Sequence, residues 1–437
     1  MTANSYIVPR VGVYSRSYTE ALGFLFWFYL GIKPMVVFLF ANDPAAGTLA
    51  ANLLDAAFFS VIFLSLVMRI VLHRLGENEI HLPTAAKLLI TFLAWSAISL
   101  LWTHADSLNS AAGYWGIIVL DIVIVLMLIR MSDLDQIGVR ALQGLVLGTT
   151  LLAFLALAFV SKSGERLGDA ELLHPNSIGN YVGVALLCNI YLITQVARRR
   201  RDQLFWMGCE LIMVLALLRS MSKTSMVAIV LAGFVYLLRS NQSARRKWGV
   251  ALLLAGALAV ATPFVIDTLY HNQTKSEVET FSGRTQLWLE TWDMIRDNPV
   301  VGYGFFSFRN YGPQIFSDIK LVHAHNEWLN LWFSLGLVGV VLAFLIYATY
   351  LRQMFRISKW PQSAPKAALA IALVSFTLVR GITEATNSLV YPMALMFLIL
   401  LWTGERRMPF YRYEPVVARP VTPSHALRGS AGFRLEN

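Results

Sequence analysis

The chain has 437 residues, of which 57% are hydrophobic and only 14% are charged. Soluble domains carry about 25% charged residues, so this composition argues against a water-soluble fold. The formal net charge of +10 would suit a nucleic-acid-binding protein. The basic residues cluster in the connections between apolar segments, however, and that pattern explains the charge without nucleic acid.

Apolar segments long enough to cross a bilayer, about 17–25 residues each, recur along nearly the whole chain. The first one follows a polar stretch without a small-residue cleavage site, so we expect an uncleaved signal anchor. The sequence therefore predicts an all-α polytopic membrane protein of about 12 transmembrane helices. These helices are expected at residues 21–40, 50–70, 84–102, 112–130, 139–160, 176–196, 203–218, 223–238, 247–267, 327–350, 367–385 and 388–404.

The topology follows from the positions of lysine and arginine. If the N-terminus is cytoplasmic and the sides alternate, the strongest basic clusters, at 198–201, 239–247, 352–359 and from Arg406 onward, all fall in the cytoplasm. Both termini are then cytoplasmic. The expected parts are a cytoplasmic N-terminus (1–20), transmembrane helices 1–9 (21–267), a large periplasmic loop with short helices (268–326), transmembrane helices 10–12 (327–404) and a disordered basic tail (405–437).

Some polar residues fall inside the predicted helices. Cys188 and Cys209 are expected to be packing residues, not a disulfide or a metal pair. Ionisable groups are costly inside a bilayer unless they are paired. Arg380 and Glu384 are spaced i, i+4 in the predicted helix 367–385, and we expect them to neutralise each other in preference to a catalytic role. The other such groups are Asp55, Asp121 and Glu210.

The large loop contains a predicted helix from about Gly283 to Asp297. Ser282 can cap it, and Asn298-Pro299 would end it. Trp288, Trp292 and Ile295 would form one apolar face, which predicts a helix lying on the membrane interface. Gly302 and Gly304 follow in a predicted tight turn.

Arg284 falls in the first turn of this helix, where the helix dipole disfavours a cation by about 0.3–1 kcal/mol. A bound anion would reverse that effect, because exposed backbone amides and a guanidinium group together suit a phosphate. Contact with lipid headgroups, or a pair with Glu279, is the alternative. Further cations of the same membrane face are Arg166, Arg219 and Lys223, and a lipid-linked diphosphate would explain this concentration.

His323, His325 and Asn326 stand where the loop enters the next helix. Two histidines at i and i+2 do not share a helix face, and no further ligands are obvious, so no metal site is expected. A neutral imidazole can take a proton from an alcohol near neutral pH. The alternative is structural: Asn326 caps the helix and the histidines are hydrogen-bonded fixtures.

An ordered set of motifs resembles the O-antigen ligase and polymerase superfamily, which includes Wzy-type polymerases and exopolysaccharide polymerases of the ExoQ type. The motifs are Gly283-Arg284-Thr285-Gln286-Leu287-Trp288, Asn298-Pro299-Val300-Val301-Gly302-Tyr303-Gly304, His323-Ala324-His325-Asn326-Glu327-Trp328-Leu329 and Leu335-Gly336-Leu337-Val338-Gly339. Arg166-Leu167-Gly168 and His174-Pro175-Asn176 resemble the family's first periplasmic motif. The resemblance covers most of the chain.

The resemblance implies a GT-C-like glycosyltransferase of the inner membrane with a periplasmic active site. It would need neither a metal nor another cofactor, and its donor would be a glycan on undecaprenyl diphosphate. Arg166 and Arg284 would hold the diphosphate, with Arg219 and Lys223 as further cations, although the family commonly has arginine where Lys223 stands. His325 would activate the acceptor hydroxyl.

In the implied site, His323 is the second candidate for the base, and His174, Asn176 and Asn326 are supporting residues. Other implied partners are an acceptor glycan or lipid, a chain-length regulator and export machinery. We favour a polymerase over a ligase that joins polymer to lipid A core, because nothing indicates recognition of that core. A polysaccharide or lipid-linked-sugar transporter or flippase is the competing class, and a non-catalytic envelope scaffold is a third possibility.

Overall fold

The computed structural model describes residues 11–40, 43–72, 82–160, 162–163, 166–168, 173–240, 284–313, 323–385 and 390–403. Within these residues the regular secondary structure is helical except for one antiparallel pair of short strands, β1 (Lys162–Ser163) and β2 (Arg166–Leu167). Nine described helices are long and apolar enough to span a membrane. The prediction of an all-α polytopic membrane protein is confirmed.

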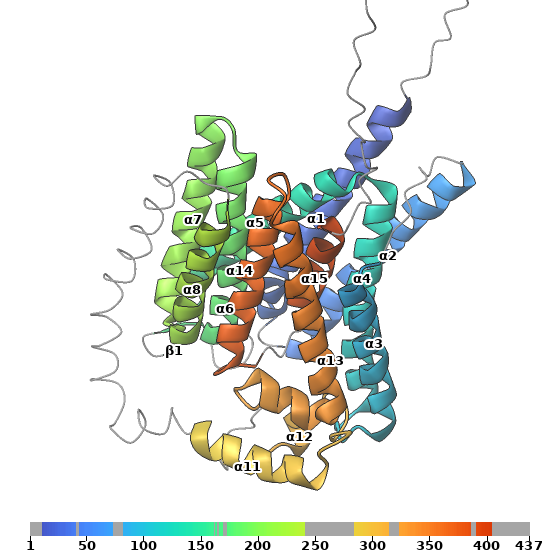
Figure 1. Ribbon diagram of the computed structural model, residues 1–437, viewed down its shortest axis with the longest axis vertical. Helices are drawn as coiled ribbons and strands as arrows, with labels where there is room; N and C mark the ends of the chain where they lie inside the picture. The colour runs from blue at the N-terminus through green and yellow to red at the C-terminus, as the bar shows by residue number, and fades with distance from the viewer. Residues whose placement is uncertain are drawn as a thin grey trace, which may run out of the picture. The chain divides into compact units, whose positions relative to one another are not determined.

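Figure 1 shows the helices as a bundle, with α11 at its lower end. Their bounds are α1 Val11–Phe38, α2 Pro44–Val71, α3 Thr84–Ile98 followed by the 3₁₀ turn η1 Ser99–Trp102, α4 Leu108–Met131, α5 Leu134–Phe159, α6 Pro175–Tyr191 followed by the π-helical η2 Leu192–Val196, α7 Arg200–Ser220, α8 Lys223–Arg239, α11 Arg284–Asp297, α12 Phe308–Tyr311, α13 Glu327–Ile357, α14 Ala364–Gly381 and α15 Val390–Trp402.

All predicted transmembrane segments but one coincide with a described helix. The exception, 247–267, lies outside the described residues. Residues 268–283 and 314–322 of the predicted loop, which include Ser282 and Glu279, and the predicted tail also lie outside them. Two matching helices are shorter than a usual span: α8 has 17 residues and α15 has 13. The number twelve therefore stays a prediction.

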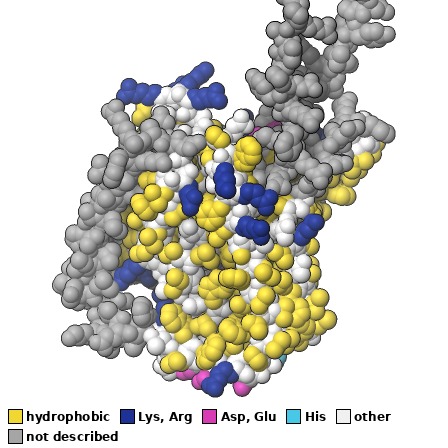
Figure 2. All heavy atoms as spheres, viewed as in Figure 1, with side chains coloured by type: hydrophobic (Ala, Val, Ile, Leu, Met, Phe, Trp, Pro, Cys, Tyr) yellow, Lys and Arg dark blue, Asp and Glu magenta, His cyan; other side chains and the backbone are white. Residues whose placement is uncertain are grey.

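Close approach between helices holds the bundle together. Helix α1 packs along α5, where a Cβ at Gly144 would lie 2.2 Å from the carbonyl oxygen of Phe24 and one at Gly148 would lie 2.0 Å from that of Phe28. Small residues at such contacts are typical of membrane helices. Hydrophobic side chains cover much of the outer face in Figure 2, as a lipid environment requires.

A break in α13 fixes the loop that follows α11. Gly336 has φ 65° and ψ −171° inside this helix, so the carbonyls before it are released from the helical hydrogen-bond pattern. The amides of Tyr303 and Gly304 donate to the carbonyls of Phe333 and Ser334, each at 2.9 Å. We call these two hydrogen bonds the backbone lock, because they join the motif at 298–304 to α13 just before the motif at 335–339.

Helix α11 has the predicted extent, and it buries one face against the protein. Leu287, Thr291 and Ile295 are buried, whereas Trp292 is 42% exposed and Trp288 is only partly covered. The physical reason is tertiary packing, because aromatic residues of the following loop and of α13 supply a protein partner for the Leu287 face. Of the predicted apolar face, Ile295 is thus buried against the protein, and a position of Trp288 and Trp292 on the membrane interface stays a prediction.

We expect Gly336→Ala to destabilise the protein strongly. A non-glycine residue in this conformation costs about 1–3 kcal/mol, and its Cβ would lie 2.1 Å from the carbonyl oxygen of Val300. Thermal unfolding of the purified protein in detergent measures the effect. Gly116→Ala in α4 is the control, because its Cβ meets nothing within 4 Å. Equal melting temperatures for the two variants would contradict the lock.

Candidate functional site

A buried carboxylate is the centre of the site. Glu384 lies just beyond the end of α14, and its side chain is 2% exposed. Its Oε1 accepts hydrogen bonds from Arg284 Nη2 at 2.5 Å and from Asn176 Nδ2 at 2.6 Å. Its Oε2 accepts one from His325 Nδ1 at 3.2 Å. Glu384 thus joins the start of α11, the start of α6 and the turn before α13.

Glu384 is ionised in this setting. Burial by itself raises the pKa of the Glu384 carboxyl, but the hydrogen bond and charge of His325, with the charges of Arg284 and Arg380, outweigh burial and hold the pKa at about 2. The ionised carboxylate can only accept hydrogen bonds. His325 therefore carries a proton on Nδ1, and in the neutral form of the ring its Nε2 is an acceptor.

Arg166 approaches from the β2 strand. Its Nη2 donates to Asn176 Oδ1 at 2.9 Å, and its Nε donates to the carbonyl of Ser220 at 3.2 Å. Burial lowers the pKa of Arg166, while the charge of Glu384 raises it. His174 caps α6, because its Nδ1 accepts from the Asn176 amide at 3.2 Å. These contacts fix Asn176 as a bridge between Arg166 and Glu384.

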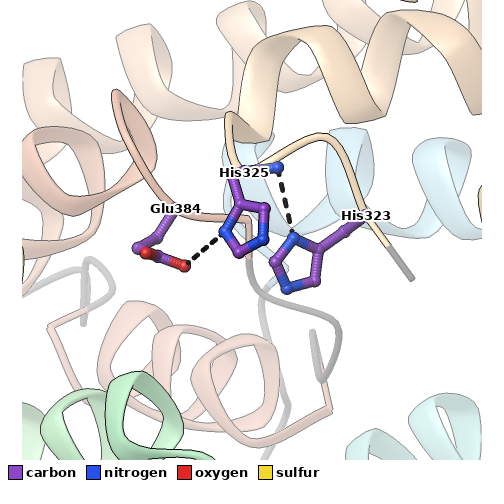
Figure 3. Close-up of side chains that lie close together, drawn as sticks. All are labelled: His323, His325 and Glu384. Carbon is purple, nitrogen blue, oxygen red and sulfur yellow. Dashed lines mark hydrogen bonds and ion pairs between the residues drawn. The ribbon is translucent and has the colours of Figure 1, made fainter. Parts of the chain in front are cut away.

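The backbone around His325 is unusual. His325 has φ 49°, a left-handed conformation that non-glycine residues seldom adopt and that often marks functional sites. Its amide donates to His323 Nδ1 at 3.2 Å, as Figure 3 shows. Asn326 ends the turn by capping α13, since its Oδ1 accepts from the amides of Trp328 and Leu329. The turn thus presents His325 toward Glu384.

His323 is a support for His325 in this arrangement. Burial and the neighbouring His325 lower the pKa of His323 to about 3, so it stays neutral at physiological pH. Its Nδ1 lone pair is engaged by the His325 amide, so the neutral ring carries its proton on Nε2. Of the two histidines, only His325 therefore offers an unengaged basic nitrogen within the described hydrogen bonds.

The remaining predicted cations divide into two groups. Lys223, at the first residue of α8, interacts electrostatically with Arg166 and Arg284 and so belongs to the cluster. Arg219 is exposed near the end of α7, and no described contact joins it to the other site residues. Arg380 also belongs to the cluster: its Nη2 donates to the Asn176 carbonyl at 3.3 Å, and its buried Nε has no hydrogen-bond partner among the described residues.

His323, His325 and Glu384 place potential metal-ligand atoms within 4.8 Å of one another. Both Glu384 oxygens and His323 Nδ1 already accept hydrogen bonds, which leaves His325 Nε2 as the unengaged nitrogen of the group. The charges of Arg284 and Arg380 also act on Glu384, and further positive charge there is unfavourable. This arrangement favours the hydrogen-bond network over a metal ion.

Comparison with known proteins points to one family. Residues 208–344 match the family model described as O-Antigen ligase. The resemblance to that family is confirmed. This matched segment contains Arg284, His323 and His325 but ends before Glu384.

Two curated relatives agree with the family match. An O-antigen ligase of Salmonella typhimurium is 22% identical over 60% of this chain and 65% of its own length. The exopolysaccharide production protein ExoQ of Rhizobium meliloti is 23% identical over 76% of this chain and 80% of its own length. The chain therefore spans just under two thirds of the length of the O-antigen ligase.

A solved structure described as a peptidoglycan synthase complex that coordinates polymerization and crosslinking contains a similar chain. It shares 16% identity with this protein and covers 74% of it, with 98% of its own chain matched and a TM-score of 0.41. This score is too low to support an argument.

The family motifs locate most of the cluster, but the sequence interpretation missed Glu384. Its spacing from Arg380 predicted a pair within one helix, yet α14 ends at Gly381 and the Glu384 carboxylate contacts Arg284 and His325 instead. The charges of Arg380 and Glu384 do stabilise each other, as expected, but the described ion pairs of Glu384 are with Arg284 and His325. An acidic residue near a helix end, on the same predicted face as Arg284 and His325, was the available signal.

We expect Glu384→Gln to lose roughly 3 kcal/mol of stability at neutral pH, the equivalent of lowering a carboxyl pKa from 4.5 to about 2. Because the folded-state pKa is depressed, this contribution is present above about pH 4.5 and is lost as the pH falls toward 2. Melting temperatures should therefore differ between wild type and variant from pH 8 to 5 and converge below pH 4.5.

Asp293→Asn is the matched control for this measurement. Asp293 is 72% exposed and pairs only with the exposed Arg296 among the described ion pairs, so its melting temperature should follow the wild type at every pH. A Glu384→Gln variant that also followed the wild type would contradict the central role of the carboxylate.

Proposed function

We propose that this protein is a glycosyltransferase of the bacterial inner membrane. Acting at the periplasmic face, it would transfer a glycan from undecaprenyl diphosphate to an acceptor hydroxyl. The observation that carries the proposal is the contact of ionised Glu384 with both His325 and Arg284. One carboxylate thereby orients a base and holds a phosphate-binding side chain beside it. The family match supports the same class of reaction.

His325 acts as the general base in the proposed reaction. Glu384 fixes the proton on Nδ1 and stabilises the imidazolium that forms, as a carboxylate does in a catalytic triad. His325 Nε2 removes the proton from the acceptor hydroxyl, and that oxygen forms a bond to the anomeric carbon of the donor sugar. The bond from this carbon to the diphosphate oxygen breaks, and its electron pair leaves with the diphosphate. Attack opposite the leaving group inverts the anomeric configuration.

The charge balance of the cluster suits a diphosphate. Arg166, Arg284, Arg380 and Lys223 are cations, and the acidic groups that interact with them are Glu384 and Glu327. Positive charge is therefore in excess among the described residues. A diphosphate would offset this excess, and preorganised cations stabilise negative charge that develops on the leaving group. Chemistry of this kind needs no metal ion and no cofactor.

Polymerisation of repeat units is the activity we favour. The ExoQ relative matches more of this chain than the O-antigen ligase relative does. Transfer of finished polymer to lipid A core is the second activity, since the family model is described as O-Antigen ligase. The two differ in the acceptor and not in the base or the leaving group.

One feature would instead suit a transporter. Lys33 and Asp55 form a buried ion pair at 2.6 Å between α1 and α2, and Asp121 of α4 is fully buried. Charged groups within a membrane often mark transport pathways. The pair is internally neutralised, whereas the cluster around Glu384 has excess positive charge, so we rank transfer above transport.

Arg284→Ala and His325→Ala should each abolish surface polymer, or polymer-capped lipopolysaccharide, while the protein remains in the membrane. Arg284→Lys should retain only part of the activity, because lysine provides a point charge without the guanidinium fork. Arg296→Ala is the control on the same helix, since Arg296 is 71% exposed and pairs only with exposed Asp293 among the described ion pairs. Gel analysis of extracted polysaccharide gives the readout.

Normal polymer in both alanine variants would remove the enzymatic proposal. A deletion strain separates the two activities: single repeat units accumulate on the lipid carrier when a polymerase is lost, and long chains remain on it when a ligase is lost. If the lipid-linked donor instead accumulates on the cytoplasmic side of the membrane in the deletion strain, the result would support transport.

Chelation should leave the activity unchanged. Both Glu384 oxygens and His323 Nδ1 already accept hydrogen bonds, so transfer by the purified protein should proceed equally with and without EDTA. Loss of transfer that is restored by one divalent cation would show that His323, His325 and Glu384 bind a metal.

A further inference from the structure

Two tryptophans follow Arg284 along one side of α11. Trp288 and Trp292 come four and eight residues after Arg284, a spacing that keeps them near one helix face. At 1.5 Å per residue, Trp292 lies about 12 Å along the helix from Arg284. Trp332 of α13 joins them, because its ring contacts that of Trp292 with 5.3 Å between ring centroids. The aromatic side chains therefore lead away from the cluster around Glu384.

The protein holds these indole rings in place. Trp288 Nε1 donates to the carbonyl of Ala324 at 2.9 Å, directly beside His325. Trp332 Nε1 donates to the carbonyl of Pro299 at 2.9 Å, in the loop that is locked to the α13 break. Trp292 stands perpendicular to Trp332, with an interplanar angle of 90°. Fixed rings lose little conformational entropy when a ligand packs on them.

Trp292 is not needed to cover the core. The buried side of α11 is formed by Leu287, Thr291 and Ile295, whereas Trp292 remains 42% exposed. An exposed aromatic ring held by its neighbours is typical of a binding surface.

The surroundings of Trp292 are polar. Asp293, next to Trp292 in the sequence, pairs with Arg296, which lies one turn further along α11, and both side chains are more than 70% exposed. Lipid tails would leave such groups without hydrogen-bond partners. A sugar ring suits them, because its C–H faces pack on aromatic rings while its hydroxyls hydrogen-bond to amides and carboxylates. Leu289, 62% exposed, is the apolar exception.

We propose that Trp288, Trp292 and Trp332 form a glycan-binding track that holds the sugar chain as it leads away from the cluster around Glu384. The inference rests on the proposed function for the identity of the ligand. It explains why a chain of several sugars can stay bound between transfers: the rings hold sugar units remote from the one that reacts. The polar groups of α11 favour this ligand over a lipid surface.

Protection of an engineered thiol tests the track without requiring turnover. The natural Cys188 and Cys209 are buried. Leu289 is 62% exposed and lies three residues before Trp292, beside it on α11, so Leu289→Cys places an exposed thiol next to Trp292. The full-length protein is purified in detergent and treated with a polar maleimide. The probe ligand is surface polysaccharide purified from the wild-type strain. Labelling should slow about fivefold at a polymer concentration about four times Kd.

Two further variants make the result specific. Adding Trp292→Ala to Leu289→Cys should return the labelling rate to within about twofold of the ligand-free rate, because the main stacking surface is lost. Trp360→Cys places a thiol at a position that is 61% exposed and lies in the turn between α13 and α14. Polymer should not slow its labelling. Dextran in place of the native polymer controls for viscosity.

The proposal is overturned if polymer fails to protect Leu289→Cys, or if protection survives Trp292→Ala. It is also overturned if incorporation into phospholipid vesicles alone blocks labelling, since α11 would then face lipid. Failure of the proposed function gives a different result: Arg284→Ala and His325→Ala would keep normal polymer synthesis. Thiol protection together with normal synthesis in those variants would establish a glycan-binding track in a protein that does not catalyse transfer.

Discussion

The arrangement of the candidate site depends on one buried carboxylate. An ionised group that is 2% exposed persists only if nearby donors and cations replace the water it has lost. Glu384 obtains them from three separate segments, through Asn176 of α6, Arg284 of α11 and His325 of the turn before α13. Each of these segments must therefore end or begin at the same place. Because the buried carboxylate needs these donors and cations, it fixes where α6, α11 and the turn before α13 meet at this end of the bundle.

The backbone lock between α13 and the preceding loop also helps to hold α11 in position, at the end of α11 that is remote from Arg284. Helix α11 could not hold Arg284 in position by its start alone, because a helix fixed at one end can pivot. The loop after α11 is bound to the carbonyls released at Gly336, and the α11 face at Leu287 packs on α13. The helix is thus attached at both ends. Precise placement of the Arg284 side chain requires this kind of support.

The sequence predicted those features that depend on local chemistry. The extent of α11, the turn glycines and the capping by Asn326 follow from short-range signals, and the structure has all of them. It could not predict which face of α11 is buried, because that depends on packing against α13. The sequence also predicted a pair between Glu384 and Arg380, because residues at i and i+4 are neighbours on a helix. That spacing is informative only while the helix continues. The helix ends at Gly381, so the partner of Glu384 was decided by tertiary contacts.

Glu384 also links substrate binding to base strength in the proposed reaction. Without a ligand, its charge is shared between Arg284 and His325. A diphosphate that binds Arg284 competes for the guanidinium, so less of the carboxylate's charge is compensated by the arginine. The carboxylate then stabilises an imidazolium at His325 more strongly, which favours uptake of the acceptor proton. Donor binding and proton removal would thus depend on the same carboxylate.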